Sequence, residues 1–291
     1  MVAQSQTITI ENPTGLQRSE LVAIDVAALG IEAGKGVIVR DISNIERPTQ
    51  WTYDGKLLME VHVRPHGKAV FTVQAGTPAA FRSWVDGRQY PERLDDIAFE
   101  NDRIGFRIYG PALQRKGEKG YGYDLWVKRT TELVLGELYR NDPRLSFHLG
   151  ITEHRILSID KGSNFVESTV WYDGLKQPTD VLAGFPIRPA GAETLVKGDG
   201  YIQYADPTIE PDRYQTQVYV ALLFPDQMVD IDVVQQHAVG ILRRYTSSQR
   251  FHYFIDAAWS EFDVRSQAEW QLRIESMMEA KKSPLQVNIV K

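Results

Sequence analysis

The stretch "FENDRIGFRIYGPALQ", residues 99–114, contains the alternation of side chains that decides the fold. In an extended strand every second side chain points to the same face, so Ile104, Phe106 and Ile108 share one face. The polar residues Asn101, Arg103, Arg107 and Tyr109 share the other face. This pattern predicts a strand of an antiparallel sheet that has one face in the core and one polar face.

A second strand with the same pattern follows in "GYDLWVKRT", residues 122–130. Its apolar row contains Tyr123, Leu125 and Val127, and its other row contains Asp124, Trp126 and Lys128. A guanidinium, an ammonium, a phenol and an indole on one sheet face are suited to binding a carboxylated sugar, because Arg pairs with carboxylate through two hydrogen bonds. The alternative is a solvated face with cross-strand charge pairs.

Short runs of β-branched and aromatic residues recur along the whole chain, separated by Gly, Pro, Asp and Asn. This spacing predicts an all-β, antiparallel sandwich rather than alternating strands and helices. One helix is expected, over residues 267–281, with Ser266 and Glu269 as its capping box. Pro284 ends it and "LQVNIVK", residues 285–291, is a terminal strand. The segment "VVQQHAVGILRRY", residues 233–245, is compatible with helix or strand.

A domain boundary is expected within "QAGTPAAFRSWVDGRQYPERLDD", residues 74–96, where turn-forming and charged residues interrupt the strands. This predicts a small N-terminal β domain at residues 1–90 and a larger sheet assembly at residues 91–291.

The composition argues against several classes of protein. With 33 Lys and Arg against 38 Asp and Glu, the formal net charge is -5, which disfavours nucleic acid as a partner. The chain has no Cys, so a thiolate nucleophile, a disulfide and a Cys-ligated metal are excluded. No apolar stretch is long enough for a membrane span, and no signal peptide precedes the first strand. We therefore expect a cytoplasmic protein as the sequence is written, or a periplasmic or secreted one if it is a mature form.

Five carboxylates lie close together in "PERLDDIAFEND", residues 91–102. A solvated acidic loop is the simpler interpretation; a calcium site is the alternative, although the spacing is not that of an EF-hand. The histidines do not form HExxH or another metal-ligand spacing. We therefore expect no metal and no cofactor, with calcium as the one alternative.

Several motifs together resemble a bacterial family of domains of unknown function, number 4861. They are "AFENDRIGFRIYGPAL" (residues 98–113), "YDLWVKRT" (123–130), "ILSIDKGSNF" (156–165), "VLAGF" (181–185), "YADP" (204–207) and "FHYFIDAAW" (251–259). The resemblance implies a β-supersandwich related in fold to galactose mutarotases and some polysaccharide lyases. It also implies an association with the breakdown of acidic polysaccharides, and a lyase or dehydratase that acts on uronic acid ends of oligosaccharides.

The resemblance and the polar strand faces together give a set of candidate residues. The expected catalytic residues are Arg107, Tyr109, Lys128, Tyr139 and His148. The expected substrate-binding residues are Glu100, Asn101, Asp124, Trp126 and Arg129. The chain departs from the family pattern after Tyr139, where members carry a His-rich and Gly-rich segment that is absent here. Activity is in question if that segment supplies a base or a metal ligand.

Elimination from a uronic acid requires removal of a weakly acidic proton beside a carboxylate, so neutralising that carboxylate is the main electrostatic task. In the expected mechanism Arg107, Lys128 and Asn101 do this, and Tyr109, Tyr139 or His148 acts as base and acid. Two alternatives stay open, because one sandwich fold hosts many functions: a non-catalytic carbohydrate-binding or accessory protein, and a mutarotase-like sugar isomerase. The expected partner is an acidic oligosaccharide or sugar; the oligomeric state is left open.

Overall fold

The computed structural model describes residues 5–115, 122–138, 152–208, 211, 213 and 215–290. The chain divides into two compact units. The first unit comprises Met1–Arg82 together with Glu275–Lys291, and the second comprises Ser83–Ile274. Strands predominate in both, and every strand pair of the described residues is antiparallel, so the predicted all-β class is confirmed.

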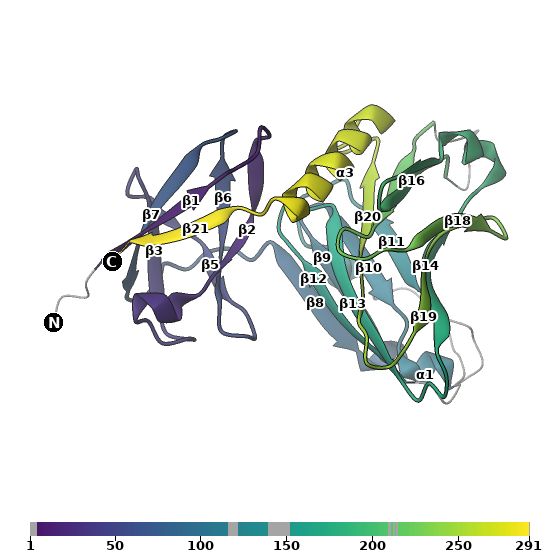
Figure 1. The fold of residues 1–291 in the computed structure, drawn as a ribbon, viewed down its shortest axis with the longest axis horizontal. Coiled ribbons are helices and arrows are strands. Elements are labelled where there is room, and N and C mark those ends of the chain that lie inside the picture. The colour runs from purple at the N-terminus through teal and green to yellow at the C-terminus, as the bar shows by residue number, and fades with distance from the viewer. Residues whose placement is uncertain are drawn as a thin grey trace. The chain divides into compact units, whose positions relative to one another are not determined.

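The first unit is a sandwich of two sheets (Figure 1). One sheet has the order β21-β1-β7-β3-β4 and the other has the order β2-β6-β5. Their bounds are β1 Gln6–Glu11, β2 Arg18–Ile24, β3 Val37–Asp41, β4 Glu46–Arg47, β5 Thr49–Trp51, β6 Leu57–Val63, β7 Lys68–Ala75 and β21 Gln286–Val290. A short 3-10 helix, η1 Val26–Leu29, follows β2. Alternate residues of these strands, among them Ile8, Val39 and Val61, form one core.

The C-terminal strand belongs to the first unit. β21 pairs with β1 along its length, so that Ile10 lies opposite Val287 and Ile8 lies opposite Ile289. Val287 and Ile289 pack against the core of this unit. The structural units therefore divide between Arg82 and Ser83, and the last residues join the first unit, whereas the sequence analysis placed the boundary at residue 90 and assigned the C-terminus to the second domain.

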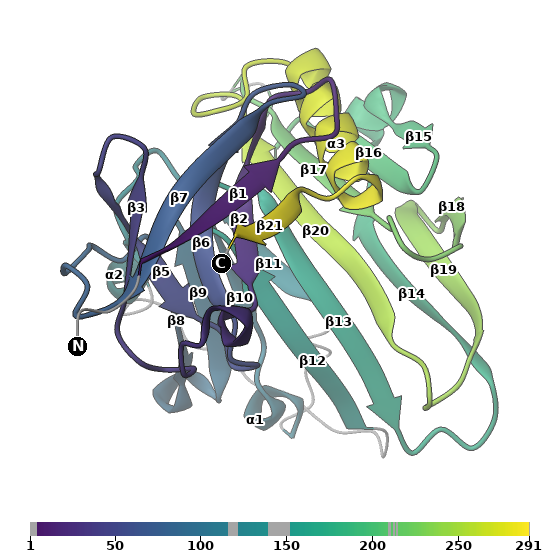
Figure 2. The same ribbon diagram turned by 60° about the vertical axis from the view of Figure 1, so that its left-hand side comes forward.

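The second unit contains three sheets. The largest has the order β12-β13-β20-β17-β16-β15, and Figure 2 shows β12, β13 and β20 side by side. Its strands are β12 Thr152–Ile159, β13 Phe165–Asp173, β15 Val196–Gly198, β16 Tyr201–Asp206, β17 Val218–Leu223 and β20 Phe251–Trp259. A second sheet contains β8 Val85–Tyr90, β9 Asp96–Asn101, β10 Ile104–Ile108 and β11 Tyr123–Val127. The third contains β14 Thr179–Pro186, β18 Asp230–Val234 and β19 His237–Tyr245.

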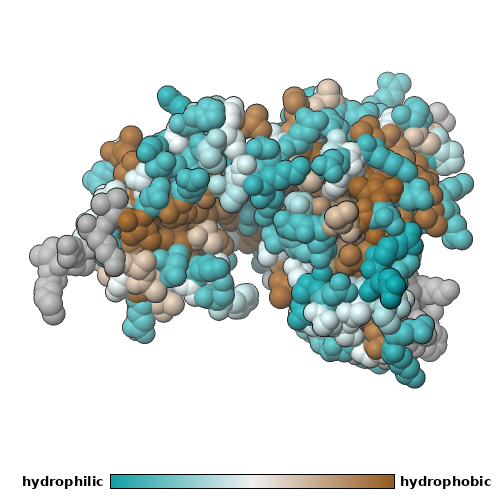
Figure 3. Space-filling view, viewed as in Figure 1, coloured by the Kyte–Doolittle hydropathy of each residue, from teal (hydrophilic) through white to brown (hydrophobic). Residues whose placement is uncertain are grey.

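Two of these sheets pack on the same face of the six-stranded sheet. Phe99, Ile104 and Phe106 of the β8–β11 sheet pack against Val166 and Ala257. Residues of the β14–β19–β18 sheet pack farther along that face: Ala183, Ala238 and Tyr245 contact Val170, Leu222 and Phe251. We call this the inner face. Figure 3 shows hydrophobic residues among hydrophilic ones on the surface of both units.

The segment of residues 233–245, ambiguous in sequence, forms the end of β18 and all of β19. The segment is a strand because β19 pairs with β14 on one side and with β18 on the other, and Gly240 within it packs directly against the ring of Phe224. The other helical elements are short: η2 Pro91–Arg93, α1 Pro111–Gln114, α2 Leu135–Leu138 and η4 Pro189–Thr194.

The one long helix, α3 (Gln267–Lys282), agrees with the predicted bounds. The Ser266 hydroxyl accepts a hydrogen bond from the Glu269 N–H at 3.1 Å, and Glu269 in turn accepts one from the N–H of Arg265 at 2.9 Å. This matches the predicted capping box except that Glu269 accepts from the N–H of Arg265 instead of the N–H of Ser266. The buried stripe of α3 consists of Trp270, Ile274 and Met278.

Candidate functional site

The first polar group of the predicted site is a buried ion pair. Lys128 Nζ lies 2.5 Å from Glu100 Oε2 and donates to the carbonyl of Asn101 at 2.7 Å. The other oxygen of Glu100 accepts from the N–H of Leu135 at 2.6 Å. The two side chains are only 3% and 1% exposed. Lys128 and Glu100, predicted as catalytic and substrate-binding residues, thus neutralise each other and join β9, β11 and α2.

Asn101, a predicted binding residue, is fully buried and organises two turns. Its amide donates to the carbonyls of Asp160 and Ser163 at 2.6 and 2.8 Å. Its Oδ1 accepts from the N–H groups of Arg103 and Ile104 at 2.8 and 3.0 Å. The predicted continuous strand is therefore interrupted: β9 ends at Asn101, and a turn precedes β10, because the Asn side chain bonds its own backbone there.

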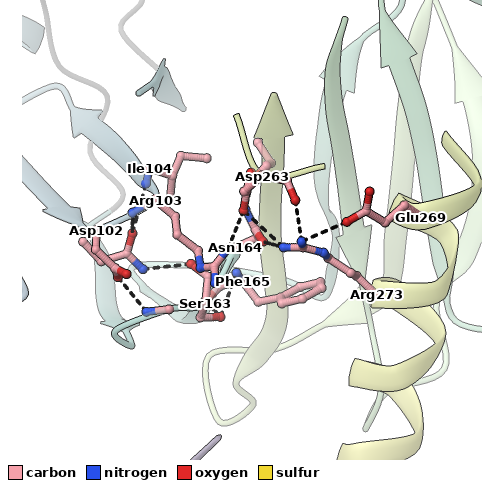
Figure 4. A network of polar contacts seen from close by, with 12 residues as sticks. Asp102, Arg103, Ile104, Ser163, Asn164, Phe165, Asp263, Glu269 and Arg273 are labelled. Atoms are coloured by element: carbon pink, nitrogen blue, oxygen red, sulfur yellow. Dashed lines mark hydrogen bonds and ion pairs between the residues drawn. The ribbon is translucent and has the colours of Figure 1, made fainter. Parts of the chain in front are cut away.

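The network continues from this turn to α3 (Figure 4). Arg103 Nη1 lies 2.6 Å from Asp263 Oδ2, and Arg273 of α3 binds the side chain and the carbonyl of the same residue at 3.1 and 2.5 Å. Asp102 accepts from the N–H of Gly162 at 2.7 Å. The polar residues that open the quoted stretch hold loops and helix together within the second unit.

Other carboxylates of the acidic stretch also have partners in the protein. Asp96 accepts from the N–H of Gly110 at 3.1 Å, and Asp95 lies 3.4 Å from Arg115. Glu92 lies 3.5 Å from Arg88. They serve different contacts rather than one shared centre, and among the described residues no group of three His, Cys, Asp or Glu side chains is placed to hold a metal ion.

Four of the predicted residues do come together, on the outer face of the β8–β11 sheet. We call Arg107, Tyr109, Asp124 and Trp126 the outer-face cluster. Arg107 Nε donates to Asp124 Oδ2 at 2.8 Å, its Nη2 also contacts that oxygen, and the Tyr109 hydroxyl donates to it at 2.8 Å. The guanidinium lies 5.7 Å from the Trp126 ring centroid. Asp124 therefore occupies the position that a substrate carboxylate was expected to take.

The remaining predicted residues lie elsewhere. The Arg129 guanidinium lies over the ring of Trp259, 4.6 Å from its centroid. Tyr139 and His148 fall outside the described residues.

A second cluster, which the sequence analysis missed, lies on the inner face of the six-stranded sheet. We call Tyr123, Glu153, Arg155, Ser168, Tyr172 and Tyr253 the junction cluster, because its neighbours come from all three sheets. The Tyr123 ring, from β11, lies 4.8 Å from the Arg155 guanidinium, and its hydroxyl is 3.3 Å from Ser168 Oγ. At the other end, the rings of Tyr172 and Tyr245 of β19 meet edge to face at 5.7 Å.

Arg155 is the centre of the junction cluster. Its Nε and Nη2 donate to Glu153 Oε1 at 2.8 and 2.5 Å, and its Nη1 donates to the Tyr253 hydroxyl at 2.9 Å. A guanidinium carries more N–H donors than these three contacts use, so Arg155 retains donors for a further anion. The side chain of Arg155 is 17% exposed and that of Glu153 is 40% exposed, so the cluster reaches solvent at Glu153.

The environment perturbs two titratable groups of this cluster. Burial, then the charge of Glu153 and the hydrogen bond to it, raise the pKa of Tyr172. Burial also raises the pKa of Glu153, while the hydrogen bond from Tyr172 opposes this shift. The cluster thus combines a protonated phenol, a basic carboxylate and a guanidinium.

A signal for this cluster is present in the sequence. Glu153 and Arg155 in "TEHRILSI", residues 152–159, have the same parity as the core residues Leu157 and Ile159. In the next strand Ser168 and Tyr172 have the parity of Val166 and Val170. A polar residue at a position that the alternation assigns to the core indicates a functional or strained site.

The described residues contain no helix that is both long and apolar enough to cross a membrane. The fold and the clusters define a β-sandwich protein with a cluster of acid–base groups at the meeting of three sheets. The chain belongs to the family described as "Domain of unknown function (DUF4861)", which it matches over residues 10–149 and 148–287. The predicted family membership is thereby confirmed.

The chain is also similar to individual proteins, among them one curated protein and one solved structure. "Uncharacterized protein P7" of Formosa agariphila is 20% identical over 380 positions, covering 99% of this chain and 94% of that protein. This alignment is longer than the 291 residues of the chain, so the relative contains segments without a counterpart here. A structure of a glycosyl hydrolase family 38 protein from Enterococcus faecalis has a TM-score of 0.40 at 8% identity; the alignment covers 99% of this chain and 47% of that one, about half its length.

Proposed function

We propose that the protein acts on uronic-acid-containing oligosaccharides by β-elimination, with the junction cluster as its site. The observation that carries the proposal is the arrangement of Arg155 between Glu153 and Tyr253, with Tyr172 directly opposite Glu153 on the neighbouring strand. A cationic fork, a basic carboxylate and a protonated phenol are the three groups that elimination beside a carboxylate needs. The outer-face cluster is the alternative site, since Arg107 there also has a carboxylate and a phenol as partners, Asp124 and Tyr109.

Each group has one role in the proposed reaction. The remaining donors of Arg155 bind the uronate carboxylate and stabilise the negative charge that develops on it when the C5 proton leaves. The Glu153 carboxylate takes that proton, and the electron pair of the C5–H bond forms the C4–C5 double bond. The C4–O bond breaks, and Tyr172 gives its proton to the departing oxygen. Glu153 then gives the C5 proton to the phenolate of Tyr172, which lies opposite it on the neighbouring strand.

The test is near-ultraviolet absorbance of the conjugated, unsaturated uronate during incubation with a panel of uronic-acid oligosaccharides. Arg155→Gln and Tyr172→Phe are expected to lower turnover by about a hundredfold or more. Arg107→Gln and Tyr109→Phe are the matched controls, since they make the same changes in the outer-face cluster. Circular dichroism and thermal melts establish that all four variants are folded.

The outcomes separate the competing readings. Loss of turnover in the two control variants, with turnover kept in Arg155→Gln and Tyr172→Phe, would place the chemistry at the outer-face cluster. Anomer interconversion without absorbance would identify a mutarotase-like isomerase. Thermal stabilisation by the sugars without any product would identify a binding protein, because a ligand that binds only the native state raises its stability.

A further inference from the structure

The first half of α3 covers the outer face of the six-stranded sheet, which is the face opposite to the junction cluster. Trp270 is fully buried, and its ring stacks on Phe165 at 5.8 Å and on Tyr219 at 6.5 Å. Asp256 of β20 lies opposite Phe165 of β13. It is three residues from Tyr253 on the same strand, so the two side chains point to opposite faces of the sheet. Asp256 therefore points to the α3 side, whereas Tyr253 points to the junction cluster.

Buried polar atoms without a hydrogen-bond partner are concentrated under this half of α3. Within the described residues seven such side-chain atoms occur, and four of them are here: Gln203 Oε1, both carboxyl oxygens of Asp256, and Trp270 Nε1. Gln203 pairs with Ala221, and Ala221 pairs with Asp256, so the two polar residues lie in one row on either side of a small side chain. Buried groups of this kind are normally satisfied by protein, water or ligand.

A cavity of about 370 Å³ opens at the Gln203 end of this row. It lies between η4, β15, β16 and α3, and its lining consists of Glu193, Thr194, Val196, Gln203, Gln267, Ala268 and Gln271. Gln203 belongs to this lining; it is fully buried, and its Oε1 has no hydrogen-bond partner. The volume is within the range of small-molecule sites.

The existing hydrogen bonds fix the orientation of the amides around this cavity. Gln267 Nε2 donates to the carbonyl of Thr194 at 2.6 Å, and Gln271 Nε2 donates to the Tyr201 hydroxyl at 2.5 Å. Gln203 Nε2 contacts Gln271 Oε1. Each of these contacts uses one of the two N–H groups of an amide nitrogen. The acceptors that make no such contact are the carbonyl oxygens of Gln203 and Gln267 and the carboxylate of Glu193.

The charge of the lining selects among ligands. The lining contains one carboxylate and no Lys, Arg or His, so a uronate or phosphate would find no cation there. Oxygen acceptors on amides match the hydroxyl groups of a neutral sugar, which donate hydrogen bonds. A lone carboxylate without a second charged ligand gives little preference for a metal cation over hydroxyl groups.

We propose that this cavity, the α3 pocket, binds one neutral sugar unit through Gln203, Gln267 and Glu193, with Gln271 holding the Gln203 amide in place. The pocket is independent of the junction cluster, because the two lie on opposite faces of the same sheet. A neutral unit bound here and a uronate bound at Arg155 are recognised by different chemistry, amide carbonyls in one case and a guanidinium in the other.

The experiment is isothermal titration of the full chain with D-galactose, D-glucose, L-rhamnose and D-xylose, with D-galacturonate and ammonium chloride as charged probes. At least one neutral sugar is expected to bind, and Gln267→Ala and Gln271→Ala are expected to weaken that binding by about tenfold, the effect of one or two hydrogen bonds. Leu272→Ala is the matched control, since Leu272 is exposed on the same helix outside the pocket. Melting temperatures show that the helix stays folded.

Arg155→Gln separates this proposal from the proposed function. Neutral-sugar binding that persists in Arg155→Gln supports the α3 pocket whether or not the junction cluster is catalytic. Absence of binding by all four neutral sugars overturns the proposal, and so does binding that Gln267→Ala and Gln271→Ala leave unchanged. Tighter binding of ammonium or galacturonate, weakened by the same two variants, would also overturn it.

Discussion

The buried pair of Lys128 and Glu100 gives the sharpest test of whether the predicted catalytic lysine is structural. Lys128→Met removes the ammonium but keeps an unbranched apolar side chain of similar length. It leaves the Glu100 carboxylate, whose side chain is 1% exposed, without its cation. Breaking a buried ion pair from one side costs about 3–5 kcal/mol. For a unit of the size of Ser83–Ile274, about 2–4 °C are lost per kcal/mol, so we expect the melting temperature to fall by about 6–20 °C.

The matched control is the double variant Glu100→Gln/Lys128→Met. It contains no buried charge, and the Gln carbonyl oxygen can still accept the N–H of Leu135, which binds Glu100 at 2.6 Å. We expect it to recover at least half of the stability lost in Lys128→Met, measured by urea denaturation and by thermal melts. A free energy of unfolding of Lys128→Met within about 1 kcal/mol of the wild type would refute the reasoning. Loss of turnover at unchanged stability would instead favour the catalytic role that the sequence suggested.

Three further predictions concern buried polar groups and close packing. Burial raises the pKa of Asp256 well above 3.8. Between the pKa of the unfolded chain and that of the folded protein, Asp256 therefore keeps its proton only when the protein is folded. The free energy of unfolding then falls as the pH rises above about 4, by at most about 1.4 kcal/mol per pH unit. Asp256→Asn should therefore gain melting temperature relative to the wild type between pH 5 and pH 8, and a difference that does not change with pH would contradict this. Asn101→Ala should lower the free energy of unfolding, measured by urea denaturation, by about 2–4 kcal/mol, because it removes two N–H donors and an oxygen that accepts from two N–H groups. Asp102→Asn keeps its acceptor oxygen and should lower the same free energy by less than about 1 kcal/mol. Gly240→Ala would place a Cβ 2.2 Å from the Phe224 ring and should destabilise by about 1–3 kcal/mol. Gly136→Ala should be tolerated, because its Cβ would meet no atom of the described residues within 4 Å; equal melting temperatures for the two variants would contradict the packing argument.

The local patterns were sufficient for the fold class and for the faces of individual strands. The alternation in residues 104–108 correctly placed Phe106 in the core and Arg107 on the outer face, because the side-chain period of a strand does not depend on its neighbours. Ser266 and Glu269 located the start of α3 for a similar reason, since helix capping involves residues close in sequence. The outer-face cluster was also brought together as expected.

Other features depended on partners that are distant in sequence. Asn101 bonds the carbonyls of Asp160 and Ser163, which no pattern around Asn101 indicates. The placement of β21 beside β1 joins the two ends of the chain in one sheet. Arg155 meets Tyr123 and Tyr253 only because three sheets converge on it.

The sequence by itself determined the all-β class, the strand faces, the long helix and the family, because each rests on residues that are near one another along the chain or on motifs that can be compared directly. Tertiary structure alone decided which charged groups neutralise each other and which polar groups meet on the inner face. The physical reason is that pairing and burial depend on strand order and sheet packing, and these bring Glu100 to Lys128, and Arg155 to Tyr253, from opposite ends of long segments.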